Sequence, residues 1–239
     1  MKILVIDVGG THVKLLATGQ KKPTKIPSGP SMTAKEMAAL VRKAAANWKY
    51  DVVSIGYPGP VVHGMPVAEP YNLGKGWVGF DFAKVFDRPV KVINDAAMQA
   101  LGSYSGGRML FLGLGTGLGS AMIVDGIVQP MELAHLPYKN GRTYEDYLGV
   151  AGLKRWGKKK WKTHVRDVVE RLKLALEADY VVLGGGNARL LKKLPQGVRA
   201  GDNANAFLGG FRLWERSDRT LNSTGGYAQG SSPRSREQG

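Results

Sequence analysis

The sequence predicts an α/β protein built as two similar lobes that face each other across a central cleft. Short apolar runs typical of strands alternate with segments of helical periodicity, which is the pattern of α/β folds. In addition, a strand, a glycine turn and a returning strand occur twice, at residues 3–17 and at residues 109–124. This internal duplication predicts lobes at residues 1–105 and 106–215. The polar remainder, 216–239, is rich in Ser, Gly and Arg and is predicted to be a disordered basic tail.

Each copy of the duplicated unit has the pattern of a hairpin. In the first copy, the apolar residues 3–6 lead to a turn at Gly9 and Gly10, and residues 13–17 run back. In the second, residues 109–112 lead into the glycine-rich stretch 113–119, and residues 121–124 return. Glycine permits the backbone conformations that such tight turns require.

The other elements follow in order along the chain. Thr33 and Glu36 have the spacing of a helix capping box, and apolar residues recur at helical intervals from Met37 to Trp48. Residues 52–55 and 90–93 are predicted strands, and a helix is expected at 96–104. In the second half, a helix with apolar positions at 165–176 precedes a strand at 180–183. Three glycines end that strand, and another helix is expected after them.

The composition excludes several classes of protein. The 239 residues are 43% hydrophobic and 22% charged, which is an ordinary globular balance. The apolar runs are far too short to cross a bilayer, and the first of them has no signal-peptide features. Cysteine is absent, which rules out disulfides and thiolate metal sites and favours a reducing, cytoplasmic compartment.

The chain is strongly basic, with a formal net charge of +15, and therefore attracts polyanions. Nine Lys or Arg residues lie between positions 154 and 173, against only Asp167 and Glu170. This basic segment has two interpretations. It is either a solvated helix face or a track for a polyanion such as polyphosphate or nucleic acid.

Three glycine-rich turns follow predicted strands, at Asp7-Val-Gly-Gly-Thr11, at residues 113–119 and at residues 184–186. Backbone N–H groups of glycine turns can approach an anion closely, so these turns could bind phosphates. Any one of them alone could equally be a simple tight turn. The P-loop pattern of nucleotide-binding proteins does not occur in the sequence.

Taken together, these turns resemble the phosphate and adenosine segments of actin-like sugar kinases. The motifs that carry the resemblance are Asp7-Val-Gly-Gly-Thr11 with Lys14, the second glycine hairpin, and Leu183-Gly-Gly-Gly-Asn187. Four further motifs resemble the ROK family: Gly56-Tyr-Pro-Gly-Pro60, Asn72-Leu-Gly-Lys-Gly-Trp77, Ile93-Asn-Asp-Ala-Ala97 and Glu132-Leu-Ala-His135. The resemblance runs from Met1 to about Trp214 and is nearest to glucokinases, especially those that use polyphosphate as well as or instead of ATP.

The resemblance implies a two-lobed actin-like ATPase fold, also described as ribonuclease H-like. It implies transfer of a phosphoryl group from ATP or polyphosphate to the 6-hydroxyl of glucose. Asp95 would be the general base that removes the proton of this hydroxyl, and Asn94 would bind sugar hydroxyls. The alternative is that Asp95 only caps the helix that follows it, since Asn and Asp are favoured at that position.

The family motifs imply further sugar-binding and phosphate-binding residues. The sugar-binding residues would be Asn72, Glu132, His135 and Glu145, with Asp146 as an alternative to Glu145. The residues near the donor phosphates would be Asp7, Gly9, Gly10, Thr11, Lys14, Gly115, Thr116, Gly117, Gly185 and Gly186. Asp7 could also hold Mg²⁺ through water, unless it only forms the turn.

The chain departs from the family in one important respect. Many members carry a structural zinc, held by the histidine of the Glu132-Leu-Ala-His135 motif and a following cysteine cluster. Because this chain has no cysteine, we expect no such zinc site. Ala134 stands where the family usually has glycine. We therefore expect that His135 is free for the sugar and that packing holds the loop after it.

Several alternatives to a glucokinase stay open. The chain could phosphorylate another hexose or an amino sugar, or it could bind sugars or polyanions without catalysis. A sugar-responsive repressor of this family would carry a helix-turn-helix ahead of the first hairpin, and the hairpin here begins too early for one, so no DNA-binding domain is expected. Only the resemblance to the family suggests a homodimer, which members of the family commonly form.

Overall fold

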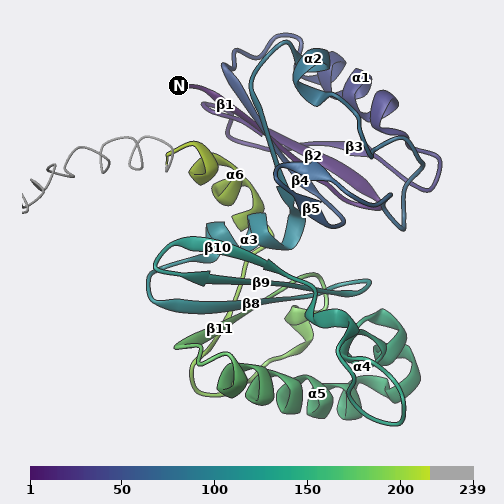
Figure 1. Cartoon of the computed structure of the whole chain (residues 1–239), viewed down its shortest axis with the longest axis vertical. Helices are drawn as coiled ribbons and strands as arrows, with labels where there is room; N and C mark the ends of the chain where they lie inside the picture. The colour runs from purple at the N-terminus through teal and green to yellow at the C-terminus, as the bar shows by residue number, and fades with distance from the viewer. Residues whose placement is uncertain (216–239) are drawn as a thin grey trace, which may run out of the picture.

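A computed structural model describes residues 1–215 as two five-stranded mixed sheets with helices on both faces (Figure 1). The first sheet contains β1 (Ile3–Val8), β2 (His12–Ala17), β3 (Thr24–Pro27), β4 (Val52–Tyr57) and β7 (Val90–Asn94). The second contains β8 (Arg108–Leu114), β9 (Leu118–Val124), β10 (Ile127–Met131), β11 (Tyr180–Gly184) and β12 (Val198–Ala200). The predicted tail, 216–239, lies outside the described residues.

The two sheets have the same topology. Their strand orders are β3-β2-β1-β4-β7 and β10-β9-β8-β11-β12, so in each the first three strands form antiparallel hairpins. The fourth strand then pairs in parallel with the first, and the fifth pairs in parallel with the fourth. This repeated order agrees with the duplication expected from the sequence. It also brings the carboxyl ends of the parallel strands, where the glycine turns lie, to one edge of each sheet.

Helices cover the outer face of each sheet. On the first, α1 (Ala34–Ala44) and α2 (Phe82–Phe86) bury Met37, Val41 and Phe82 against Leu4 and Ile6 of β1. The expected cap of α1 is present, because Thr33 Oγ1 accepts a hydrogen bond from the Glu36 amide at 3.2 Å. On the second sheet, α4 (Tyr144–Leu148) and α5 (Val150–Ala175) form the corresponding layer.

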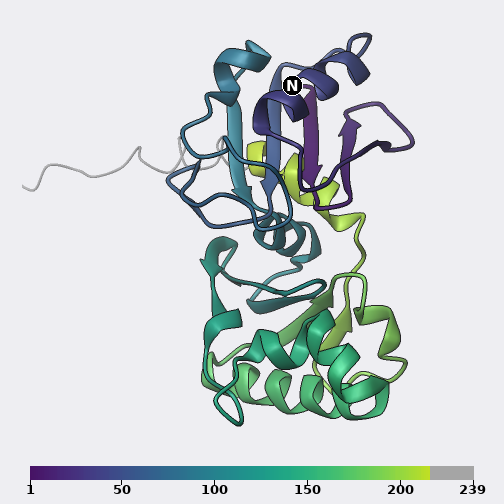
Figure 2. The same ribbon diagram turned by 90° about the vertical axis from the view of Figure 1, so that its right-hand side faces the viewer.

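Helix α3 (Asp95–Ser103) lies between the two sheets (Figures 1 and 2). Its Met98 packs with Val5 of the first sheet, whereas Ala97 and Leu101 pack with Phe111 of the second. A helix buried against two sheets needs apolar residues on most of its surface. The α3 sequence, with six buried residues of nine, satisfies this requirement.

Helix α6 (Asn205–Glu215) returns to the first sheet, although the predicted boundaries place it in the second lobe. It crosses α3 at glycines: a Cβ on Gly209 would overlap the carbonyl oxygen of Met98. Ser54 of β4 donates to the Gly210 carbonyl at 2.6 Å, and Arg212 donates to three carbonyls at the end of α3. The lobe boundaries themselves stay a prediction.

Three smaller elements complete the fold: a two-stranded ribbon of β5 (Val61–Val62) and β6 (Met65–Pro66), and two single turns of 3₁₀ helix, η1 (Leu133–His135) and η2 (Ala188–Leu190). The prediction of a helix after the third glycine turn is wrong, because only the single turn η2 lies between that glycine turn and β12. Pro195 and the glycine at position 197 lie in this short connection to β12, and both residues disfavour a longer helix. No helix in residues 1–215 is long and apolar enough to cross a bilayer.

Candidate active site

Asp95 is the first residue of α3, directly after the carboxyl end of β7. The helix cap is Asn94, whose Oδ1 accepts from the Ala97 amide at 3.1 Å. Capping therefore does not account for Asp95, whose Oδ1 accepts a hydrogen bond from the adjacent Ala96 amide at 2.7 Å. Asn94 also donates through Nδ2 to the Gly59 carbonyl at 3.0 Å, which leaves it one N–H for a ligand.

The Asp95 carboxyl lies in a half-buried position close to other carboxylates. Burial and the negative charges of Asp7 and Glu132 together raise its pKa to about 7, against the lowering effect of hydrogen bonds from the Ala96 amide and from its own amide. Asp7 is the residue before the last of β1, and its register partner on β4 is Gly56, which in turn pairs with Ile93 of β7. A carboxyl poised near neutral pH between other acids is the environment expected of a general base.

The first glycine turn lies beside Asp7 and is closed by local hydrogen bonds. The Gly9 amide donates to the His12 carbonyl at 3.1 Å, and Ser28 Oγ donates to the Gly9 carbonyl at 2.6 Å. Thr11 is exposed at the tip of the turn. A Cβ on Gly10 would lie 2.9 Å from the Cβ of Asn72, so the structure brings Asn72 to this turn.

Asp7 itself is buried, with 5% of its surface exposed, and its Oδ2 forms an ion pair with Lys14 Nζ at 2.9 Å. Both residues lie on adjacent strands in direct register. The described residues contain no cluster of three or more His, Cys, Asp or Glu side chains that could hold a metal by themselves. One carboxylate near bound phosphates is nevertheless sufficient for Mg²⁺, which keeps most of its waters.

The second and third glycine turns form a single unit at the edge of the second sheet. Asn187 joins them, because its amide donates to the Leu114 carbonyl at 2.9 Å and its Nδ2 donates to the Gly115 carbonyl at 3.1 Å. Gly185 has a φ of +81°, and a Cβ there would overlap the backbone of Leu114. Only glycine fits this position. The predicted phosphate residues Gly115, Thr116, Gly117, Gly185 and Gly186 therefore lie together.

This unit also reaches the catalytic candidate. A Cβ on Gly119, at the end of the second turn, would lie 2.8 Å from the Cβ of Ala96, the residue after Asp95. The start of α3 thus contacts the second hairpin, while the strand before it belongs to the first sheet. Asp95 is therefore positioned where the glycine turns of both sheets converge.

The predicted sugar-binding residues reach the site to different degrees. Glu132 is exposed after β10, and its charge acts on Asp95. His135 is exposed on η1 and makes no hydrogen bond or ion pair with the rest of residues 1–215. Glu145 Oε2 accepts from the Leu118 amide at 3.1 Å, which places it over the second glycine turn. Asp146 instead forms a capping box with Thr143 at the start of α4, so Glu145 is the better sugar candidate.

Comparison with known proteins agrees with this arrangement. The sequence profile of the ROK family matches residues 3–130. The chain belongs to the ROK family. It is 31% identical to a polyphosphate glucokinase of Mycobacterium tuberculosis over 79% of this chain and 78% of that protein. It is also 32% identical to a glucokinase of Pyrobaculum calidifontis, over 53% of this chain and 45% of that protein.

Solved structures of other ROK proteins confirm the two-lobed actin-like ATPase fold. The inorganic polyphosphate/ATP-glucomannokinase of Arthrobacter sp. strain KM superposes with a TM-score of 0.77 at 23% identity, covering 90% of this chain and 99% of that one. A ROK family glucokinase of Streptomyces griseus, solved with glucose and AMPPNP, gives a TM-score of 0.69 at 16% identity, covering 90% and 100%.

In this ROK protein, hydrogen bonds and aromatic rings hold the loop after His135. Tyr138 donates to Asp167 of α5 and contacts His164 Nδ1 at 3.1 Å, and Lys139 pairs with Asp167 at 3.0 Å. The ring of Tyr138 packs edge-on against Tyr147 with centroids 4.8 Å apart. The bond from Tyr138 holds the pKa of Asp167 well below its usual range, so this anion persists at neutral pH.

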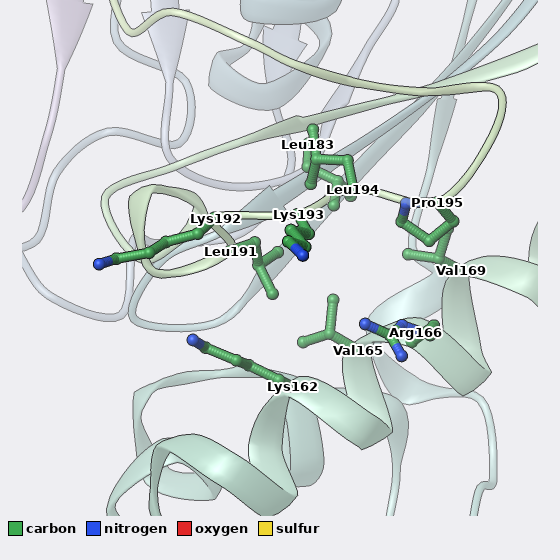
Figure 3. A pocket seen from close by; sticks show the side chains of 10 residues that line it. All are labelled: Lys162, Val165, Arg166, Val169, Leu183, Leu191, Lys192, Lys193, Leu194 and Pro195. Carbon is green, nitrogen blue, oxygen red and sulfur yellow. The ribbon is translucent and has the colours of Figure 1, made fainter.

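A basic cavity of about 300 Å³ opens beside the third glycine turn (Figure 3). Its walls are α5 and the segment at 191–195, and Leu183 of β11 forms part of its floor. Sequence reasoning missed Lys192 and Lys193 here, as well as Tyr138 and Asp167, and it quoted Asn187 as part of a motif without giving it a role. The nearest sequence signal was at Asn187, which directly follows the glycine triplet. The other four act through contacts with residues far away in the sequence: Tyr138 bonds to Asp167 of α5, and Lys192 and Lys193 line the cavity together with α5.

Proposed function

We propose that this chain transfers a phosphoryl group to the 6-hydroxyl of glucose, with ATP or polyphosphate as donor and Asp95 as the general base. The observation that carries the proposal is the Asp95 carboxyl, whose pKa is raised to about 7 at the point where the glycine turns of both sheets converge. In its ionised form it accepts the hydroxyl proton while the hydroxyl oxygen attacks the terminal phosphorus. The bond from that phosphorus to the donor chain breaks, and the donor leaves one phosphate shorter.

The glycine turns support a site for the donor phosphates on the other side of Asp95. Backbone amides of the turns and the exposed Thr11 hydroxyl are suitable donors for phosphate oxygens. Asp7 would hold Mg²⁺ through water, and the ion when bound would neutralise charge on the donor phosphates. Lys14 is held beside Asp7 by their ion pair, so it can contribute a second positive charge at the same place.

The sugar would lie on the side of Asp95 that faces Glu132. Asn72, Asn94, Glu132, His135 and Glu145 are the proposed partners of its hydroxyls. A sugar hydroxyl that loses its partner in a closed site is costly, so several convergent polar side chains are needed for selectivity. Asn94 directly precedes Asp95 in the chain, and the charge of Glu132 acts on the Asp95 carboxyl.

The identity of the enzyme class rests on relatives as well as on geometry. A polyphosphate glucokinase is 31% identical over most of both chains, which supports a hexokinase-type phosphotransferase and favours glucose as the acceptor. Its name also favours polyphosphate as a donor, whereas the glucokinase relative does not specify one. Another hexose or an amino sugar stays the alternative acceptor, and a homodimer stays a prediction.

A coupled phosphorylation assay tests the proposal. Glucose, mannose, fructose and an N-acetylated amino sugar are each combined with ATP and with polyphosphate, in the presence of Mg²⁺. We expect the highest kcat/KM with glucose and at least one of the two donors. Absence of turnover with every pair would refute the kinase function, and preference for another sugar by tenfold or more would refute glucose as the acceptor.

A further inference from the structure

Helix α5 carries basic side chains on two faces with different surroundings. Lys162 and Arg166, four residues apart, lie on the face that lines the basic cavity, together with Val165 and Val169. The opposite side carries Asp167 and Arg171, which pair with each other at 3.0 Å and face the loop after His135. The basic segment is therefore not one uniform track.

Four cations converge on the cavity from two sides. Lys162 and Arg166 extend from α5, and Lys192 and Lys193 extend from the segment after η2; Figure 3 shows Lys162 and Lys192 reaching toward the same opening. None of the four forms an ion pair with another residue within 1–215. Unpaired like charges around one concave space repel each other and raise the local positive potential. This arrangement favours a bound polyanion.

The position of the cavity connects it to the phosphate turns. Leu183, which lines it, directly precedes the third glycine turn, and Asn187 on the far side of that turn is bonded to Gly115 of the second. An extended donor whose terminal phosphate lies at the glycine turns would therefore have its distal part close to the cavity. The remaining lining is aliphatic: Val165, Val169, Leu183, Leu191, Leu194 and Pro195.

We propose that this cavity binds internal phosphates of a linear inorganic polyphosphate chain that serves as the phosphoryl donor, so the inference rests on the proposed function. Such a chain carries roughly one negative charge per phosphate, and cations on two walls can contact it from both sides. Single-stranded nucleic acid is a poorer fit, because its binding relies on aromatic platforms and the lining contains no aromatic residue.

Helical spacing also divides the lysines at 158–160. Lys158 lies four residues before Lys162, so it continues the row that borders the cavity. Lys160 faces elsewhere, because its charge acts on His164, which is bonded to Tyr138 on the other side of the helix. Lys159 lies three residues before Lys162, so it also borders this row. Lys160 is therefore combined in the control with Lys35, which is exposed on α1 of the first sheet, to give the same loss of charge.

The experiment compares Lys192→Gln/Lys193→Gln with Lys35→Gln/Lys160→Gln. Equilibrium binding of long-chain polyphosphate is measured without sugar, and KM is measured for long-chain polyphosphate, tripolyphosphate and ATP with glucose in excess. We expect the first double variant to bind long chains about tenfold more weakly and to raise their KM by a similar factor. The control should change both quantities by less than about twofold, and the KM for ATP should be unchanged.

Each other outcome has a defined meaning. Equal weakening by both double variants would show attraction by overall charge and overturn the inference, as would no weakening by either. A KM for ATP that rises as much as that for long chains would make the cavity a nucleotide site, which also overturns it. If polyphosphate binds through Lys192 and Lys193 but no donor phosphorylates glucose, the binding site stands and the proposed function fails.

Discussion

The hydroxyl of Tyr138 donates a hydrogen bond to the carboxylate of Asp167, and this bond fastens the loop after His135 to helix α5. The loop begins just after Glu132 and His135 and ends at Glu145, so it joins three of the proposed sugar-binding residues. Lys139 and Arg171 hold the same carboxylate from two further sides. Packing and polar contacts thus order a segment for which the sequence offers no cysteine ligands.

Tyr138→Phe tests the importance of this bond for the sugar site. The ring contacts with Tyr147 and Tyr144 remain, and only the hydroxyl is lost. Because a hydrogen bond to a charged group contributes about 1.5–3 kcal/mol, the loop should loosen. We expect the KM for glucose to rise about threefold to tenfold, with kcat and the KM for the donor within about twofold. Tyr144→Phe is the matched control, since its hydroxyl makes no hydrogen bond within residues 1–215. Equal effects of the two variants would contradict the prediction.

Asp95→Asn tests the general base directly. The amide cannot accept the hydroxyl proton but retains the size of the side chain, so we expect kcat to fall by about 10²–10⁴-fold. Glucose binding, measured calorimetrically, should change by less than about tenfold. Turnover close to that of the wild type would remove Asp95 from this role.

The pH dependence of activity should report the same carboxyl. A base must be ionised, so kcat/KM should fall as the pH drops below about 7, the pKa of Asp95 in the folded protein. Asp7 contributes more than Glu132 to this elevation. Asp7→Asn should therefore move the acid limb, scaled to its own plateau, further toward low pH than Glu132→Gln does. An acid limb that does not move in either variant would assign it to another group.

Stability should depend on pH through Asp95 in the opposite sense to a salt-bridged carboxylate. The folded pKa of about 7 exceeds the reference value of 3.8, so the folded state binds the proton more tightly than the unfolded state. Stability from this group is present below about pH 4 and is lost as the pH rises toward about 7. The Tm of Asp95→Asn relative to wild type should therefore increase between pH 5 and pH 8. A constant difference in Tm over this range would disprove the elevated pKa.

Gly209→Ala should destabilise the contact between α6 and α3. A Cβ at this position would overlap the Met98 carbonyl, which belongs to the backbone and cannot rotate away. We expect a loss of about 3 kcal/mol, which corresponds to a decrease in Tm of roughly 6–12 °C. Gly29→Ala is the control, because a Cβ there meets no atom within 4 Å. Similar Tm values for the two variants would show that the helices can separate without cost.

Treatment with a strong zinc-selective chelator, in excess Mg²⁺, should leave activity and Tm unchanged. The expectation follows from the absence of cysteine and from the contacts that hold the loop at Tyr138. Activity that is lost on treatment and restored by added zinc would contradict it.

The sequence by itself determined the local elements and the motifs. The runs 3–6 and 109–112, each followed by glycines, specify hairpins because the apolar pattern and the turn residues act over only a few positions. The Asn94-Asp95 pair after β7 specified a helix start, and the structure distinguishes the two, with Asn94 as the cap. The ordered set of motifs was sufficient to indicate the family.

The tertiary structure decided the relationships between distant residues. The elevated pKa of Asp95 depends on its burial and on the charges of Asp7 and Glu132, and the cavity depends on α5 meeting Lys192 and Lys193. Helix α6 returns to a sheet that ends more than a hundred residues earlier. The physical reason is that burial, Coulomb energy and close packing are set by distances in space. Those distances exist only once strands far apart in the sequence have paired and helices have packed on them.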